Sequence, residues 1–136
     1  GFAVHEVGED FSPYVEGVAQ VVVRDLAGGV GAIAASIRER FAGRVDPQQS
    51  KGYTLDLVPT GVSKATGIEA ILRATGIGAD EVMACGDSDN DLSMLRLAGT
   101  SVVTANGQEE AKALATYLAP SCDEDGVARA IEELVL

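Results

Sequence analysis

A single stretch, Val82–Leu95, constrains the fold of this chain more than any other. It runs from an apolar, strand-like segment through Gly86 into an acidic loop, Asp87–Asp91, and then into a new apolar segment. A strand, a glycine, a polar loop and a helix in this order are typical of α/β proteins, which place a metal or phosphate site beyond the carboxyl end of a strand. The stretch therefore predicts an α/β fold with a polar site in this loop.

Composition limits the partners of such a site. The chain has 136 residues, of which 46% are apolar, so it can bury the core of one compact domain or of two small lobes. Twenty-one acidic and ten basic side chains give a net charge of −11, which argues against nucleic acid and membrane surfaces as partners. An anionic ligand would need a local cation or a metal. The sequence has no signal peptide and no apolar run long enough to span a bilayer, so a cytoplasmic location is expected.

The two cysteines, Cys85 and Cys122, do not point to a metal or redox site. They lack C-x-x-C spacing and have no histidine nearby. The only histidine, His5, lies in a segment without hydrophobic periodicity, and we expect it to be a surface residue rather than a catalytic base.

Residues 1–59 predict a β-α-β-β unit. Alternation places Tyr53, Leu55 and Leu57 on one face of a strand, as expected when one face is buried. The predicted elements are a strand at Val18–Asp25, a helix at Gly28–Phe41, a short extended piece at Arg44–Gln48 broken at Pro47, and a strand at Tyr53–Val58.

A basic cluster, Arg38, Arg40 and Arg44, lies at the end of the predicted helix. It could meet an anionic substrate, but runs of like charge more often mark a solvated helix end, and the sequence favours that simpler explanation.

After residue 59 the pattern changes to a regular α/β alternation, and we place a domain boundary there. Ser63 suits the N-cap of a helix that Gly76 can close. The further elements expected are strands at Glu81–Gly86, Thr100–Thr104 and, briefly, Leu118–Pro120, and helices at Asp91–Leu97, Glu109–Tyr117 and Asp125–Leu134.

Lys64 falls in the first turn of the helix that Ser63 begins. A lysine there opposes the helix dipole, so a structural lysine would be better placed at the other end. Local conflicts of this kind concentrate at functional sites, which makes Lys64 a candidate functional residue.

The acidic loop offers three carboxylates in five positions, a density of oxygen donors that favours Mg²⁺ or Ca²⁺. An EF-hand is excluded because Leu92 stands where its glycine would be and Ala98 where its glutamate would be. A solvated helix cap explains Ser88 and Asp89 well. It explains Asp87 poorly, because that residue directly follows an apolar strand.

Four segments together resemble the haloacid dehalogenase superfamily: Gly61–Ile68 around Lys64, Gly86–Leu95, Asn106-Gly107 and Asp123–Ala128. The likeness is to its Cof-type and phosphoglycolate-phosphatase-like members with an α/β (type IIB) cap. It implies the C-terminal half of a doubly wound Rossmann-like catalytic core in residues 60–136, preceded by a partial α/β cap in residues 1–59.

The resemblance also implies roles for single residues. Asp87 would be a Mg²⁺ ligand and Asp91 would share or support the metal, so both would be catalytic. Lys64, the third catalytic residue, would bind the substrate phosphate and neutralise its charge. Asn90 would hold the loop or contact the phosphate. Asn106 is a weaker substrate-binding candidate, because a turn before Gly107 explains it adequately.

The chain departs from the family in one large respect. The Asp-x-Asp motif that follows an N-terminal strand in these phosphatases, and supplies the nucleophile and the general acid/base, is not recognisable, nor is the Ser/Thr motif. The sequence therefore resembles only the C-terminal half of such an enzyme, and we expect the chain to be inactive alone.

Two functions remain open on the sequence. The first is a Mg²⁺-dependent phosphatase that acts on a small phosphorylated metabolite, such as phosphoglycolate or a sugar phosphate, through an aspartyl-phosphate. The second is a non-catalytic, truncated relative that serves as a binding or assembly module through the edge of its unfinished sheet. The predicted macromolecular partner is accordingly a second copy or the missing N-terminal half.

Overall fold

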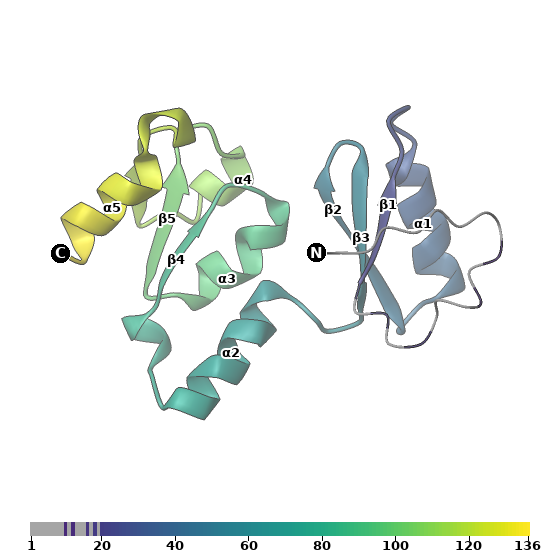
Figure 1. Cartoon of the computed structure of the whole chain (residues 1–136), viewed down its shortest axis with the longest axis horizontal. Coiled ribbons are helices and arrows are strands. Elements are labelled where there is room, and N and C mark those ends of the chain that lie inside the picture. Colours follow the sequence, from purple (N-terminus) through teal and green to yellow (C-terminus); the bar gives the residue numbers. More distant parts are fainter. Residues whose placement is uncertain (1–9, 11, 13–15, 17, 19) are drawn as a thin grey trace.

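The computed structural model describes residues 10, 12, 16, 18 and 20–136, which form two sheets with their own helices (Figure 1). His5 and most of the segment before Gln20 lie outside the described residues. The change from the first sheet to the second falls between Pro59 and Lys64. The division into domains at residue 59 stays a prediction.

The first sheet is antiparallel, with strand order β1-β3-β2. Its strands are β1 (Val21–Arg24), β2 (Val45–Lys51) and β3 (Thr54–Pro59), and helix α1 (Val30–Arg40) covers one face. Val30 and Ala34 of α1 pack on Leu55, as the predicted alternation of β3 requires. Because strand residues alternate between faces, Asp56 and Val58 lie on the other face of β3, where they line a cavity together with Lys64.

The predicted break at Pro47 is wrong. Strand β2 continues through Pro47, which pairs with Leu57 and is buried. β2 is an edge strand, so a residue without an N–H is tolerated there.

The second sheet is parallel, with strand order β4-β5-β6. Its strands are β4 (Met83–Gly86), β5 (Thr100–Thr104) and β6 (Tyr117–Ala119), and its helices are α2 (Lys64–Thr75), α3 (Leu92–Leu97), α4 (Glu109–Lys112) and α5 (Gly126–Leu134). On one face Val103 packs with Leu95 of α3 and Ala111 of α4. On the other face Val102 packs with Ala130 of α5. Helices on both faces of a parallel sheet confirm the predicted α/β class.

The predicted helix over Glu109–Tyr117 is too long. Helix α4 ends at Lys112, and Tyr117 already belongs to β6. The reason is a set of long-range hydrogen bonds between Ser101 and Thr116: each backbone N–H donates to the other residue's side-chain oxygen, at 2.9 and 3.0 Å. These bonds hold the chain against β5 and outweigh the local helix propensity of the segment.

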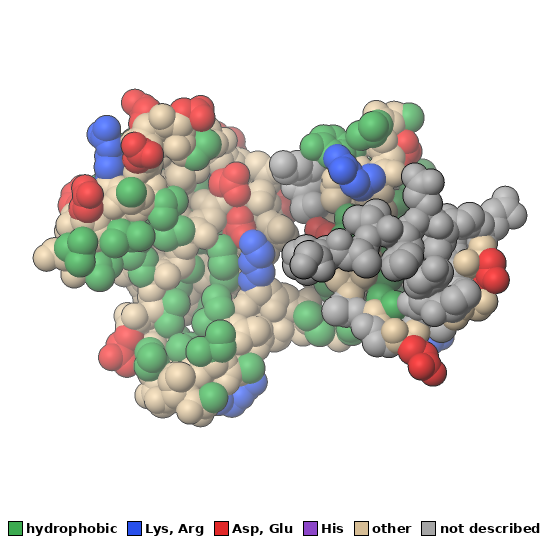
Figure 2. All heavy atoms as spheres, in the orientation of Figure 1, with side chains coloured by type: hydrophobic (Ala, Val, Ile, Leu, Met, Phe, Trp, Pro, Cys, Tyr) green, Lys and Arg blue, Asp and Glu red, His purple; other side chains and the backbone are tan. Residues whose placement is uncertain are grey.

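One side of the second sheet is uncovered in the described part of the chain. Strand β4 pairs there with β5 alone. The apolar face predicted for α5 is present, but Val127, Ile131 and Leu134 are exposed, as is Ile71 of α2. Figure 2 shows green side chains gathered over this side. An open strand edge beside exposed apolar side chains of helices is typical of an interaction surface.

None of the described helices is long and apolar enough to cross a membrane.

Replacing Leu55, which is fully buried, tests the packing of α1 on β3. We expect Leu55→Ala to lower the free energy of unfolding by about 2–4 kcal/mol, because it leaves a cavity under α1. The matched control is Leu26→Ala, whose side chain is 82% exposed and whose loss changes stability by about 0.5 kcal/mol or less. Urea unfolding followed by tyrosine fluorescence measures both; equal effects would contradict this core.

Candidate active site

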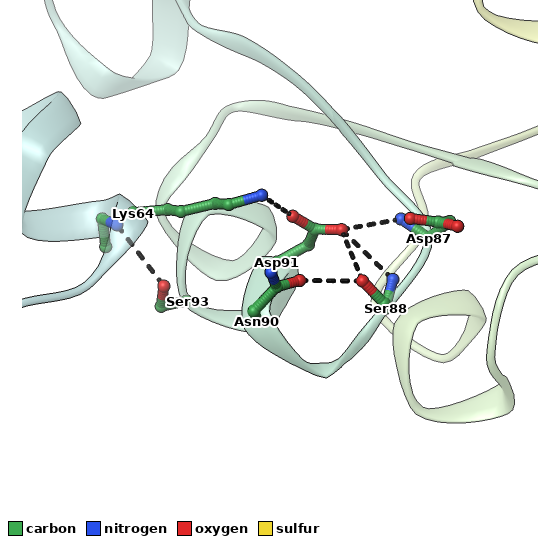
Figure 3. Close-up of polar contacts among 7 residues, drawn as sticks. Lys64, Asp87, Ser88, Asn90, Asp91 and Ser93 are labelled. Atoms are coloured by element: carbon green, nitrogen blue, oxygen red, sulfur yellow. Dashed lines mark hydrogen bonds and ion pairs between the residues drawn. The ribbon is translucent and has the colours of Figure 1, made fainter. Parts of the chain in front are cut away.

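The acidic loop is folded around the carboxylate of Asp91. This side chain is buried at the carboxyl end of β4, where Asp89–Asp91 form a 3₁₀ turn (η3). Its Oδ2 accepts hydrogen bonds from the backbone N–H of Asp87 at 3.0 Å and of Ser88 at 3.2 Å, and from Ser88 Oγ at 3.2 Å (Figure 3). Asp91 thus ties the start of the loop to its end.

Gly86 permits this close approach. A Cβ at Gly86 would lie 2.6 Å from Asp91 Cβ and 2.9 Å from its Cγ. Real Cβ atoms are not found at such separations, so the glycine between β4 and the loop is required by the position of Asp91.

Lys64 reaches Asp91 from a separate helix. Ser63 caps α2 through a hydrogen bond from Thr66 N, as predicted, and this fixes Lys64 in the first turn. Lys64 Nζ lies 2.5 Å from Asp91 Oδ1. The unfavourable placement of a cation at this helix end is therefore offset by an ion pair with a residue 27 positions later. The Lys64 side chain is 48% exposed, so its charge also faces solvent.

The surroundings of Asp91 lower the pKa of its carboxyl. Burial alone would raise the pKa of its carboxyl. The hydrogen bond and charge of Lys64, together with the N–H groups of Asp87 and Ser88, outweigh burial and hold that pKa below its ordinary value. Asp91 is consequently an anion at neutral pH, and both of its oxygens have protein partners.

Asp87 differs from Asp91 in having a free carboxylate. Its backbone is fixed, since its N–H donates to Asp91 and its C=O accepts from Gln108 N at 2.8 Å. Within the described ranges no hydrogen bond or ion pair engages its side chain, which is exposed at the carboxyl end of β4. A rigid backbone that presents an unengaged carboxylate suits a ligand for a hard cation.

The two predicted asparagines occupy different places. Asn90 accepts a hydrogen bond from Ser88 Oγ at 2.8 Å and lies beside Asp91 (Figure 3). Asn106 accepts from Cys122 N at 2.9 Å and from Ser121 Oγ at 3.3 Å, so it holds a turn before α5. The structure brings Lys64, Asp87, Asn90 and Asp91 together and does not include Asn106 in their hydrogen-bonded group.

A metal at this site would have few protein ligands. Among the residues that the structure describes, no three histidine, cysteine or acidic side chains converge on one point. Asp87 offers a free carboxylate, whereas Asp91 would have to give up a present partner. Mg²⁺ keeps several waters in protein sites and often has only one or two carboxylate ligands, so the residues fit it, but weakly.

Sequence reasoning missed the residues that face Lys64 from the first sheet. A cavity of about 250 Å³ separates the sheets; it is lined by Gln20, Gln48, Asp56, Val58, Val62, Ser63, Lys64 and Asn90. The signal was present in the sequence, because Asp56 and Val58 form the second face of the alternating strand β3. What the sequence could not show is that this face meets Lys64.

Comparison with known proteins finds relatives that match most of the chain. The sequence pattern of the haloacid dehalogenase-like hydrolases matches residues 2–131. The chain is 37% identical, over 84% of its length, to a chloroplastic protein of Arabidopsis thaliana named endoribonuclease YBEY, and 31% identical, over 87% of its length, to the 5-amino-6-(5-phospho-D-ribitylamino)uracil phosphatase YitU of Bacillus subtilis. These matches cover only 20% and 44% of the two relatives.

The fold is also that of a solved relative. A haloacid dehalogenase-like hydrolase from Bacteroides thetaiotaomicron superposes with a TM-score of 0.81 and 36% identity. The superposition covers 95% of this chain and 49% of that protein. The chain thus spans less than half the length of these three proteins.

The lowered pKa of Asp91 predicts a pH dependence of stability. A carboxyl whose folded pKa is lowered stabilises the fold above its unfolded pKa of about 4, and this contribution is lost as the pH falls through the folded value. We expect Asp91→Asn to cost about 1–2 kcal/mol at pH 7 and the difference from wild type to shrink below about pH 4.

Urea unfolding at pH 7, 5 and 3 measures this effect. Asp89→Asn is the control, because Asp89 lies in the same loop and is exposed. A deficit of the Asp91 variant that is as large at pH 3 as at pH 7 would contradict the ion pair as its cause.

Proposed function

The chain belongs to the haloacid dehalogenase-like hydrolase family, and on that premise we propose that it carries the cation-binding part of a Mg²⁺-dependent phosphatase site for a small phosphorylated metabolite. One observation carries the proposal: the carboxylate of Asp91 binds Lys64 Nζ through Oδ1 and the backbone N–H of Asp87 through Oδ2, so it joins a cation to the residue with an unengaged carboxylate. A cation and a metal ligand held in one site are what phosphoryl transfer requires, since that reaction depends mainly on positioning and charge neutralisation. They also supply the local attraction that an anion needs on a chain of net charge −11.

In this proposal each residue has a distinct task. Asp87 is the Mg²⁺ ligand, and Asp91 positions both Lys64 and the loop while supporting the metal through that arrangement. Lys64 binds the phosphate oxygens with its exposed ammonium group, and Asn90 contributes its amide. Bound Mg²⁺ would supply further neutralisation of the phosphate charge.

The nucleophile is proposed to come from outside the group just described. The resemblance implies an aspartate that attacks phosphorus with loss of the alcohol, followed by hydrolysis of the aspartyl-phosphate by water. In the described part of the chain, the carboxylate paired with Lys64 is that of Asp91. Both of its oxygens are already engaged, so Asp91 is not proposed as the nucleophile. A strand added parallel to the open edge of β4 would end beside Asp87 and could deliver the missing carboxylate there.

The name of the relative from Bacillus subtilis supports a phosphorylated metabolite as substrate, because that protein is a phosphatase of a phosphoribityl compound. Phosphoglycolate and sugar phosphates are both substrates within this proposal.

The second candidate is a binding or assembly module without catalysis. It is favoured by the open edge of β4 and by the exposed apolar side chains of α5 and α2. These surfaces would pair with a second copy or with a separate N-terminal half.

The catalytic proposal predicts metal binding without turnover. We expect Mg²⁺ to raise the Tm of the chain by roughly 2–5 °C at about ten times its Kd, and Asp87→Asn to remove this shift while the control Asp89→Asn keeps it. We expect no hydrolysis of p-nitrophenyl phosphate by the chain alone. Hydrolysis that depends on Mg²⁺ and is abolished by Asp87→Ala would show that no outside nucleophile is needed.

The assembly candidate predicts a different outcome. A dimer that persists on dilution in light scattering, is lost in Ile131→Asp, and shows no stabilisation by Mg²⁺ would favour it. Leu26→Asp is the matched control, since Leu26 is an equally apolar, exposed residue beside the other sheet. A monomer that Mg²⁺ stabilises would count against this candidate.

A further inference from the structure

A second cavity between the sheets, of about 480 Å³, is lined by two arginines from different elements: Arg38 of α1 and Arg96 of α3. Its other lining residues are Pro47, Gln48, Gln49, Ser63, Asp89, Asn90, Leu92 and Ser93. The sequence pointed to a basic cluster of Arg38, Arg40 and Arg44. Of these three, only Arg38 lines the cavity, and like the other two it is exposed, as the predicted solvated helix end requires.

The charges of the two arginines are not balanced by protein carboxylates. In the described segments neither guanidinium forms an ion pair, although the chain has 21 acidic residues and ten basic ones. Asp89 is the single acidic residue on the wall, which leaves an excess of one positive charge. A local excess of positive charge on so acidic a protein calls for an anionic occupant.

Arg38 is exposed, but one hydrogen bond anchors its guanidinium group. Its Nη2 donates to the backbone C=O of Pro47 at 3.1 Å, and Pro47 is buried in β2. A guanidinium has five N–H donors in a rigid plane, so this bond fixes the group and leaves other donors for a ligand. Arg96 lies in the last turn of α3, where the helix dipole favours a cation. The dipole accounts for Arg96 alone and not for a second arginine on the wall of the same cavity.

The cavity adjoins the one that contains Lys64. Gln48, Ser63 and Asn90 line both. Asn90 Oδ1 accepts from Ser88 Oγ, so its amide N–H₂ remains available as a donor. A ligand whose phosphate lies at Lys64 could therefore extend past Asn90 to the two arginines.

We propose that Arg38 and Arg96 form a second anion subsite that binds a phosphate group. Paired guanidinium groups bind phosphate oxygens with charge-assisted, often bidentate hydrogen bonds. The phosphate has two sources: a second phosphate on the substrate, or a free phosphate ion. The first source rests on the proposed function, whereas the subsite itself does not.

Affinity and chemical-shift measurements on the full chain with Mg²⁺ test the proposal. The probes are fructose 1,6-bisphosphate, fructose 6-phosphate and inorganic phosphate, at low ionic strength because exposed charges are screened by salt. If the second phosphate is on the substrate, we expect the bisphosphate to bind about tenfold tighter than the monophosphate, as one charge-assisted contact provides. Arg96→Ala removes this difference and leaves monophosphate binding unchanged.

Two further variants make the result specific. Arg38→Ala should have the same effect as Arg96→Ala. Arg38 also donates a hydrogen bond to Pro47, so Arg38→Ala could be unstable; Arg96→Ala then still tests the subsite. Arg40→Ala is the matched control, since Arg40 lies on α1 outside the cavity, and it should change neither affinity.

The outcomes separate the two sources and the two proposals. Shifts at Arg38 and Arg96 with inorganic phosphate, without an advantage for the bisphosphate, identify a free phosphate ion as the occupant. Such shifts in the absence of any response around Lys64 would refute the proposed function and leave the subsite standing. Responses around Lys64 alone, with equal affinity for both sugar phosphates, would overturn the subsite.

Discussion

The ion pair between Lys64 and Asp91 is the interaction on which the rest of the site depends. It joins the first turn of α2 to the loop after β4, across 27 residues of sequence. Asp91 uses its other oxygen to hold the N–H groups of Asp87 and Ser88, so one buried carboxylate fixes both the cation and the backbone of Asp87. Such an anion is tolerable in a partly buried place because each oxygen has a donor.

The space between the two sheets gives the site its surroundings. The first sheet covers its apolar face with α1 and presents Gln48, Asp56 and Val58 to the second sheet. The walls near Lys64 carry amide, hydroxyl and carboxylate groups beside Val58 and Val62, and they continue to Arg38 and Arg96. On a protein of net charge −11, these three cations supply local attraction for an anion, although Asp56 and Asp89 also line the two cavities.

The open edge of β4 lies next to Asp87, so what pairs with this edge bears on whether the site is active. The matches cover 44% of the Bacillus subtilis relative and 49% of the solved Bacteroides relative, and the edge next to Asp87 has no partner strand among the described residues. This open edge is compatible with both proposed functions. It can receive a strand that brings a nucleophile, or it can pair with another copy of the chain. Both readings follow from unpaired backbone groups beside exposed apolar side chains, which proteins rarely leave uncovered.

The sequence by itself determined the α/β class, the capped helix that carries Lys64, and the strand–loop–helix at Asp87–Asp91, because these depend on local periodicity, capping and turn residues. It failed at Pro47, where pairing with the next strand β3 outweighed local preference, and at Tyr117, where pairing with β5 did so. Only the tertiary structure decided that Lys64 meets Asp91, that no described residue engages the side chain of Asp87, that Asn106 holds a turn instead, and that Arg38 and Arg96 line one cavity. Each of these depends on which distant segments lie side by side, and that is set by packing of the whole chain rather than by any one stretch of it.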